Sequence, residues 1–143
     1  MTMFRLSPSA LDTTALRLEL SDPSCGGLVF FEGHVRDHNE GRVVTALEYE
    51  AFAPLAIKEG ERILREAVER FGVVRALCAH RVGALEVGGI AVFIGIAAGH
   101  RFFHNPTDSV AITGPEILEP VARGLAAAIA TLSEKQRGAL GAK

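Results

Sequence analysis

The spacing of hydrophobic residues changes several times along the chain, and each change predicts a new element. Residues 14–20, TALRLEL, alternate leucines with polar side chains, the period of two that is typical of a half-buried strand. Asp22-Pro23-Ser24 would end this strand. Residues 25–35 (CGGLVFFEGHV) and 43–52 (VVTALEYEAF) are expected to form two more strands, with residues 38–41 (HNEG) as the turn between them.

The next segment changes to helical spacing. Pro54 suits the first turn of a helix, and Gly72 suits its end. Between them, apolar side chains recur at steps of three and four residues, at Ile57, Gly60, Leu64, Ala67, Val68 and Phe71. The opposite face carries charged side chains of both signs, so we interpret it as solvated helix surface without chemistry.

Two further strands are predicted over residues 73–85 (VVRALCAHRVGAL) and 89–99 (GIAVFIGIAAG), joined by a turn at Gly88-Gly89. The second is apolar enough to be the central strand of a sheet. A last helix is expected to begin near Glu119 or Pro120. One helix among five strands, several of them joined by hairpins, predicts the α+β class with a mostly antiparallel sheet and flanking helices.

Length, composition and charge narrow the class of protein. The chain has 143 residues, 48% of them apolar, and no repeat or low-complexity linker, so we expect a single domain with a real core over residues 1–143. The net charge of −2 gives no global attraction to nucleic acid or to an anionic membrane. An anion site would therefore have to be local.

Cysteine usage and the N-terminus favour a cytoplasmic protein. Cys25 and Cys78 have no CxxC spacing and are too few for a secreted disulfide scaffold, so we expect two buried thiols in a reducing compartment. The first 22 residues are too polar for a signal peptide, and no run approaches the roughly 20 apolar residues of a membrane span. The protein is therefore expected to be soluble, without a membrane association.

Polar residues concentrate in three places where chemistry is possible: the tip at residues 34–39 (HVRDHN), the pair His80-Arg81, and Gly99-His100-Arg101 after the most apolar strand. An arginine at the end of a buried strand has a fixed backbone, so its guanidinium can be aimed at a phosphate or carboxylate. Each place taken alone is also compatible with ordinary surface polarity. Two or three such places on one small acidic domain leave an anion pocket and surface decoration as open alternatives.

A metal site is the other chemistry that the residues allow. The chain contains five histidines, His34, His38, His80, His100 and His104. His34 and His38 are four residues apart, which juxtaposes ligands on a helix, but here the spacing spans a strand and a turn. We therefore expect no metal and no bound cofactor. The absence of GxGxxG, Walker-type and GxSxG patterns gives no support for dinucleotide, nucleotide or serine-hydrolase chemistry.

Four motifs together resemble the large, catalytic subunit of molybdopterin synthase. They are FEGHVRDHN at residues 31–39, LEYEA at 47–51, HRVG at 80–83 and GHR at 99–101. The family's strings are F-x-G-x-V-R-x-x-N, L-x-Y-E-A-Y, H-R-x-G and S-A-H-R, in this order and at about these spacings. The resemblance is strongest over residues 25–101, and residues 102–143 diverge from it.

The resemblance implies a fold, an activity and partners. The fold would be an α/β hammerhead, in agreement with the α+β prediction. The activity would be a step of molybdenum cofactor biosynthesis, in which sulfur passes to cyclic pyranopterin monophosphate and gives molybdopterin. The sulfur donor would be a small ubiquitin-like subunit with a C-terminal Gly-Gly thiocarboxylate. The large subunit would form a homodimer within a heterotetramer, in the cytoplasm.

The resemblance also implies which residues of this chain form the site. Arg36, His100 and Arg101 match family positions in the anion pocket, and Phe31 matches an aromatic residue beside it. A cyclic phosphate and a thiocarboxylate both require fixed cations. Sulfur transfer also favours a closed, basic tunnel that polarises the donor carbonyl and excludes water.

The C-terminal segment departs from the family pattern. The family places two lysines in D-x-x-K and P-x-W-K-K-E segments, and an ungapped count puts these positions on Glu116 and Arg123 and the proline on Pro120. A guanidinium at position 123 keeps the charge but does not readily act as a base or nucleophile. Lys135, in the expected last helix, is the other candidate for a catalytic cation.

Three explanations of this departure stay open at the level of sequence: a divergent paralogue, a gene-level change such as a frameshift, or Lys135 reaching the pocket. Three functions are also kept open. The chain is an active sulfurtransferase, or a catalytically impaired module that still binds the partner, or a metal hydrolase that uses its histidines.

Overall fold

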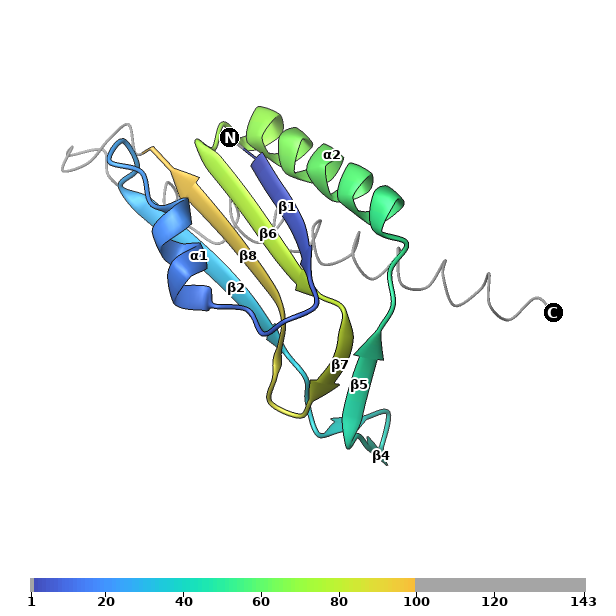
Figure 1. Cartoon of the computed structure of the whole chain (residues 1–143). Helices are drawn as coiled ribbons and strands as arrows, with labels where there is room; N and C mark the ends of the chain where they lie inside the picture. Colours follow the sequence, from blue (N-terminus) through green and yellow to red (C-terminus); the bar gives the residue numbers. More distant parts are fainter. Residues whose placement is uncertain (1, 100–143) are drawn as a thin grey trace.

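A four-stranded sheet with a helix on each face forms the body of the protein (Figure 1). The computed structural model describes residues 2–99. The strands lie in the order β1-β6-β8-β2, with bounds β1 Thr2–Ser7, β6 Arg75–Arg81, β8 Ile90–Ala98 and β2 Gly27–His34. Only the β1–β6 pair of this sheet is parallel. The α+β prediction, the mostly antiparallel sheet and the inner position of β8 are confirmed.

Two short ribbons extend from one end of this sheet (Figure 1). One pairs β5 (Ala46–Tyr49) with β7 (Gly83–Glu86), and the other pairs β3 (His38–Asn39) with β4 (Arg42–Val43). The expected turn at 38–41 is present, with positive φ at Glu40 and Gly41. The two long strands that were expected to flank it do not pair with each other, however, because β2 pairs with β8 and β5 pairs with β7.

The prediction of a strand over residues 14–20 is wrong, because this segment belongs to helix α1 (Thr13–Leu20). Asp12 caps the helix by accepting a hydrogen bond from the Ala15 amide at 3.0 Å. Leu16 and Leu20, four residues apart, are buried, whereas Leu18 is 73% exposed. The alternating leucines fit the two-residue repeat of a strand, but Leu16 and Leu20 also fit the helical spacing of four residues. Burial of this pair against the sheet selects the helix. Strand β1, which the hydrophobic pattern did not indicate, precedes α1.

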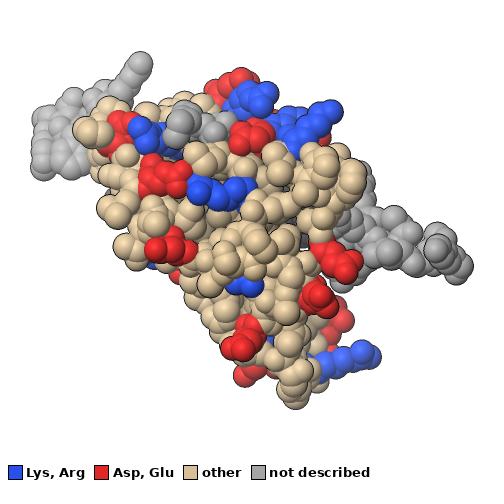
Figure 2. Space-filling model, viewed as in Figure 1, with Lys and Arg blue, Asp and Glu red and all other residues tan. Residues whose placement is uncertain are grey.

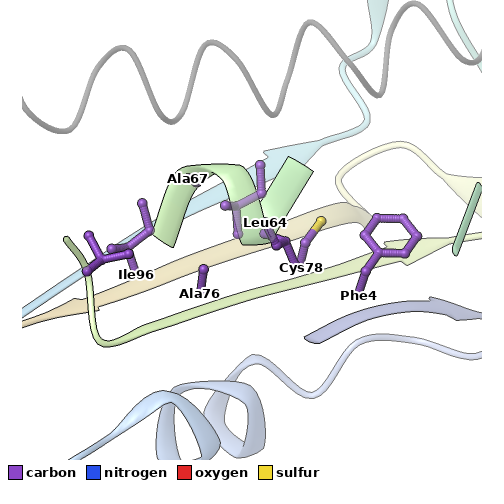
Figure 3. Close-up of a cluster of buried hydrophobic side chains, with 8 residues drawn as sticks. Phe4, Leu64, Ala67, Ala76, Cys78 and Ile96 are labelled. Atoms are coloured by element: carbon purple, nitrogen blue, oxygen red, sulfur yellow. The ribbon is translucent and has the colours of Figure 1, made fainter. Parts of the chain in front are cut away.

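Helix α2 (Ala53–Phe71) covers the other face of the sheet and confirms the predicted amphipathic helix. Pro54 lies in its first turn, and Gly72 ends it in the left-handed conformation with φ 63°. Figure 3 shows Leu64 and Ala67 between the helix and Ala76, Cys78 and Ile96 of the sheet. Ile57, expected on the buried face, is 42% exposed, and the buried residues of α2 begin only at Gly60.

The thiols differ in burial. Cys78 has no exposed surface, and burial raises the pKa of its thiol to about 12, so it behaves as a small core residue. Cys25 is only half-buried, at the margin of the core under α1. The expectation of a buried thiol is thus confirmed for Cys78 alone.

Residues 100–143 lie outside the described part of the chain, and the expected last helix from Glu119 or Pro120 falls within them. Neither α1 nor α2, the helices of residues 2–99, is long and apolar enough to cross a membrane.

Candidate functional site

The end of β2 presents Arg36 on a firmly held backbone. The pairing of β2 with β8 shifts register between Gly33 and His34, which ends the regular strand. Val35 is buried at 5% exposure, and its amide donates to the Gly89 carbonyl at 2.9 Å. The Val35 carbonyl in turn accepts a hydrogen bond from the Gly88 amide at 2.7 Å. Arg36 therefore follows a residue that is fixed both by burial and by two backbone bonds.

The Arg36 side chain is exposed and carries an uncompensated charge. Its Nη2 donates to the Asn39 side-chain oxygen at 2.8 Å, which is a neutral partner. Among residues 2–99, no carboxylate forms an ion pair with it. The adjacent Asp37 instead contacts His38 at 2.7 Å. The strand end thus presents a guanidinium, as the sequence predicted, and Asn39 orients it.

Phe31 lies on the same strand, opposite Ile94 of β8, and is 46% exposed. Its face of the sheet is the one that α2 covers further along, over β1 and β6. Gly33 sits two residues away, where a Cβ would come 2.6 Å from a methyl of Val92. An aromatic surface and a free guanidinium therefore occur on one edge strand and the loop that follows it.

The pair His80-Arg81 is divided between the two faces of the sheet. His80 is 8% exposed, its Nδ1 lies 2.7 Å from the Arg81 carbonyl, and its ring packs edge-on against Tyr49 with 4.9 Å between centroids. Burial lowers the pKa of His80, and the hydrogen bond to the backbone only partly opposes this effect. Nδ1 is then the donor to the carbonyl, and His80 is a neutral packing residue instead of an anion-binding cation.

Arg81 lies at the margin of a pocket of about 460 Å³. Its Nη2 donates to the Ala84 carbonyl at 3.1 Å, and its Nε is buried without a partner among the described residues. The pocket is lined by Ala10, Leu11, Arg81, Ala84, Leu85, Glu86, Gly88, Gly89 and Ile90.

Sequence reasoning missed two parts of this pocket, Glu86 and the segment 10–11. In the sequence, the only feature that could have pointed to this pocket was a glutamate just before the Val87-Gly88-Gly89 turn. Arg36 does not line the pocket, although the Gly88-Gly89 turn that does so also binds the backbone of Val35.

Four of the expected site residues, His100, Arg101, Arg123 and Lys135, lie outside the described residues, so their convergence on Arg36 stays a prediction. Within residues 2–99, no three His, Cys, Asp or Glu side chains are grouped so as to hold a metal ion. On the face shown in Figure 2, the coloured acidic and basic side chains are interspersed without an extended basic patch. This face therefore offers no extended basic surface to an anion.

The fold and the strand-end arginine define a small α+β protein with an exposed guanidinium, outside the ion pairs of residues 2–99, at one end of its sheet. The family model described as "MoaE protein" matches residues 6–103, and the chain belongs to this family. This match confirms the resemblance seen in the four motifs.

Two curated relatives carry a functional name. A "Molybdopterin synthase catalytic subunit" of Pyrococcus abyssi is 51% identical over 82 residues, which are 57% of this chain and 55% of that protein. A "Molybdopterin synthase catalytic subunit 1" of Mycobacterium tuberculosis is 41% identical over 97 residues, 68% of this chain and 66% of that protein. The matched part of the chain thus spans between about half and two thirds of these relatives.

A solved structure has the same fold. The crystal structure of molybdopterin synthase from Staphylococcus aureus aligns with a TM-score of 0.64 at 28% identity, covering 81% of this chain and 80% of that one. The hammerhead-type α+β architecture expected from the motifs is therefore confirmed.

Proposed function

We propose that this chain is the catalytic subunit of a molybdopterin synthase, which acts in molybdenum cofactor biosynthesis in the cytoplasm. The observation that carries the proposal is the family match over residues 6–103, which includes Phe31 and Arg36 and extends through Arg101. The names of the Pyrococcus and Mycobacterium relatives support the same activity.

The reaction transfers sulfur from the thiocarboxylate of a small ubiquitin-like subunit to cyclic pyranopterin monophosphate. Each of two sulfurs forms a C–S bond to the substrate and displaces an oxygen, one of which is an ester oxygen of the cyclic phosphate, so that the phosphate ring opens and the dithiolene forms. Water then cleaves each acyl–sulfur bond, which leaves the donor's Gly-Gly terminus as a carboxylate. Both reactants are anions. The protein must therefore supply fixed cations that bind the phosphate and the donor terminus and stabilise charge at the acyl carbon.

Arg36 suits this task for a physical reason. Its guanidinium is exposed, has only the neutral Asn39 as a hydrogen-bond partner among the described residues, and keeps its full charge for a ligand. The buried Val35 holds its backbone, so little ordering is needed when an anion binds. His100 and Arg101 are proposed to complete the anion pocket, with Phe31 beside it and Arg123 or Lys135 as the catalytic cation.

The second candidate function is a partner-binding module without sulfur transfer. One observation favours it, namely that the chain has only three lysines, Lys58, Lys135 and Lys143. Lys58 lies on the exposed face of α2. The assembly would then be the same, a homodimer with one small subunit per large subunit, but the pocket would only hold the donor's tail.

A single-turnover assay tests the proposal. Purified protein, a thiocarboxylated small subunit and cyclic pyranopterin monophosphate are mixed, and dithiolene product is measured over time. We expect product from the unaltered chain. Arg36→Ala should lower the rate at least about tenfold, because a charge-assisted hydrogen bond contributes about 1.5–3 kcal/mol.

Arg42→Ala is the matched control, since Arg42 is also an exposed arginine, on β4 of the adjacent ribbon. It should leave the rate and the melting temperature unchanged. A complex with the small subunit but no product would establish the second candidate. The absence of any complex at micromolar concentrations would refute both.

A further inference from the structure

The backbone that carries Arg36 follows an interruption of β2. The pairing of β2 with β8 shifts register between Gly33 and His34, and such a bulge breaks the regular ladder of hydrogen bonds. Gly33 has no side chain that could pack there, since a Cβ would lie 2.6 Å from a methyl of Val92. The strand end therefore depends on contacts other than the ladder to hold its position.

The Gly88-Gly89 turn provides two of these contacts. The Gly88 amide donates to the Val35 carbonyl at 2.7 Å, and the Val35 amide donates to the Gly89 carbonyl at 2.9 Å. The turn thus binds both backbone polar groups of the residue that precedes Arg36. Any displacement of the turn therefore displaces the backbone from which the Arg36 side chain extends.

The His34 side chain connects the turn to β2 a second time. Its Nδ1 lies 3.3 Å from the Gly88 carbonyl, which can only accept, so Nδ1 is the donor of this hydrogen bond. Its Nε2 lies 3.5 Å from Oε2 of Glu32, one strand position before the bulge. The ring therefore spans the distance between the turn and a carboxylate of the regular strand.

Glu32 is itself attached to helix α1. Its Oε1 accepts a hydrogen bond from Nη2 of Arg17 at 2.7 Å, and the Arg17 guanidinium lies over the Phe30 ring, 4.9 Å from the centroid. The Glu32 side chain is 21% exposed, so this ion pair is partly protected from solvent. A row of contacts thus leads from α1 through Glu32 and His34 to the turn.

We propose that His34 is a positioning residue, which holds the Gly88-Gly89 turn and thereby sets where Arg36 presents its guanidinium. Its side chain is 51% exposed and belongs to none of the hydrophobic clusters of the described residues, so its contacts with the turn and Glu32 matter more than core packing. The inference rests on the proposed function, because the position of Arg36 affects catalysis only if Arg36 binds an anionic reactant.

Amide hydrogen exchange, followed by NMR on the full chain without substrate, tests the contact with the turn. His34→Ala should speed the exchange of the Val35 and Gly88 amides at least about threefold, because a hydrogen bond that holds the turn is lost. His34→Asn should restore most of the protection, since its side-chain amide places a donor near the position of Nδ1. Unchanged exchange in His34→Ala would overturn the inference.

Single-turnover sulfur transfer tests whether His34 acts through Arg36. Cyclic pyranopterin monophosphate is varied against a limiting amount of thiocarboxylated small subunit. In His34→Ala the half-saturating substrate concentration should rise at least about threefold while the maximal rate stays within about twofold, because binding is weakened and the reacting groups are unaltered. The substitution should have no further effect in an Arg36→Ala background and its full effect in an Arg42→Ala background.

Two results of this assay would refute the inference. An equal effect of His34→Ala in the Arg36→Ala background would show that His34 acts independently of Arg36. A lower maximal rate at an unchanged half-saturating concentration would show that His34 does not act on binding. If the unaltered chain gives no product, the proposed function fails instead, and the exchange of the Val35 and Gly88 amides decides whether His34 holds the turn.

Discussion

At the scale of single residues, His80 shows how burial decides chemistry. Its neighbour in sequence is an arginine, which suggests a basic pair, yet the pleat of β6 sends the two side chains to opposite faces. His80 packs on Tyr49 and donates a hydrogen bond from Nδ1 to the Arg81 carbonyl, while the Arg81 side chain reaches the pocket. One residue of the pair therefore stabilises the fold and the other is available for binding.

The neutral state of His80 predicts a pH-dependent stability. Its pKa is lowered in the folded protein, so the unfolded chain binds a proton near pH 6.5 while the folded chain does not. The stability is complete above this pH and falls as the pH drops towards the folded pKa, by at most about 1.4 kcal/mol per pH unit for one proton. Urea unfolding between pH 7.5 and 5 measures the slope.

His80→Gln should flatten this slope, even if it lowers the stability at every pH through lost contact with Tyr49. Equal slopes in the unaltered chain and His80→Gln would show that protonation of another group controls the pH dependence.

At the scale of elements, the contact between α2 and β1 depends on a glycine. Gly60 faces Phe4, and a Cβ built on it would lie 2.3 Å from the Phe4 ring carbon Cγ. The helix thus approaches the sheet closely enough for the aromatic ring to fill the space above the glycine. Helix propensity alone would favour alanine at this position by about 1 kcal/mol.

Gly60→Ala should therefore lower the free energy of unfolding by about 1–3 kcal/mol, because overpacking outweighs the gain in propensity. Urea denaturation measures the change. Phe4→Leu opens space at the contact, so the double variant should lose less stability than the two single variants together. A Gly60→Ala protein that is more stable than the parent would show that α2 can shift away from β1 without cost.

At the scale of the whole molecule, β2 is an edge strand with an apolar surface. It pairs only with β8 among the described strands, and Leu28, Val29, Phe30 and Phe31 are each 38–46% exposed. An unpaired edge that carries apolar side chains invites pairing with another strand. The homodimer expected for this chain would protect such an edge.

Val29→Lys should accordingly weaken self-association, since it places a charge in the apolar edge. Val43→Lys is the control, because Val43 is 84% exposed at the tip of the β3–β4 ribbon. Sedimentation velocity over a range of concentrations should show dimers for the parent and for Val43→Lys, and a shift towards monomer for Val29→Lys. Unchanged dimerisation in Val29→Lys would place the interface elsewhere.

Features that depend on neighbouring residues could be predicted from the sequence alone. Helix α2 follows from its apolar spacing, Pro54 and Gly72, and β8 from an uninterrupted apolar run. The strand-end position of Arg36 followed from the polar break after residues 25–35, and the four motifs in order were sufficient for the family. These signals are local, so they can be recognised without knowing which segments meet.

Features that depend on distant partners could be seen only in the folded chain. The leucines of residues 14–20 fit a strand or a helix, and the buried space available over β6 and β8 selected the helix. The pairing of β2 with β8, the burial of His80 against Tyr49, and the meeting of Leu11, Arg81 and Glu86 in one pocket likewise join segments far apart in the chain. Such contacts arise because several segments compete for a limited buried surface. The sequence of one segment alone therefore does not predict which distant segment it will pack against.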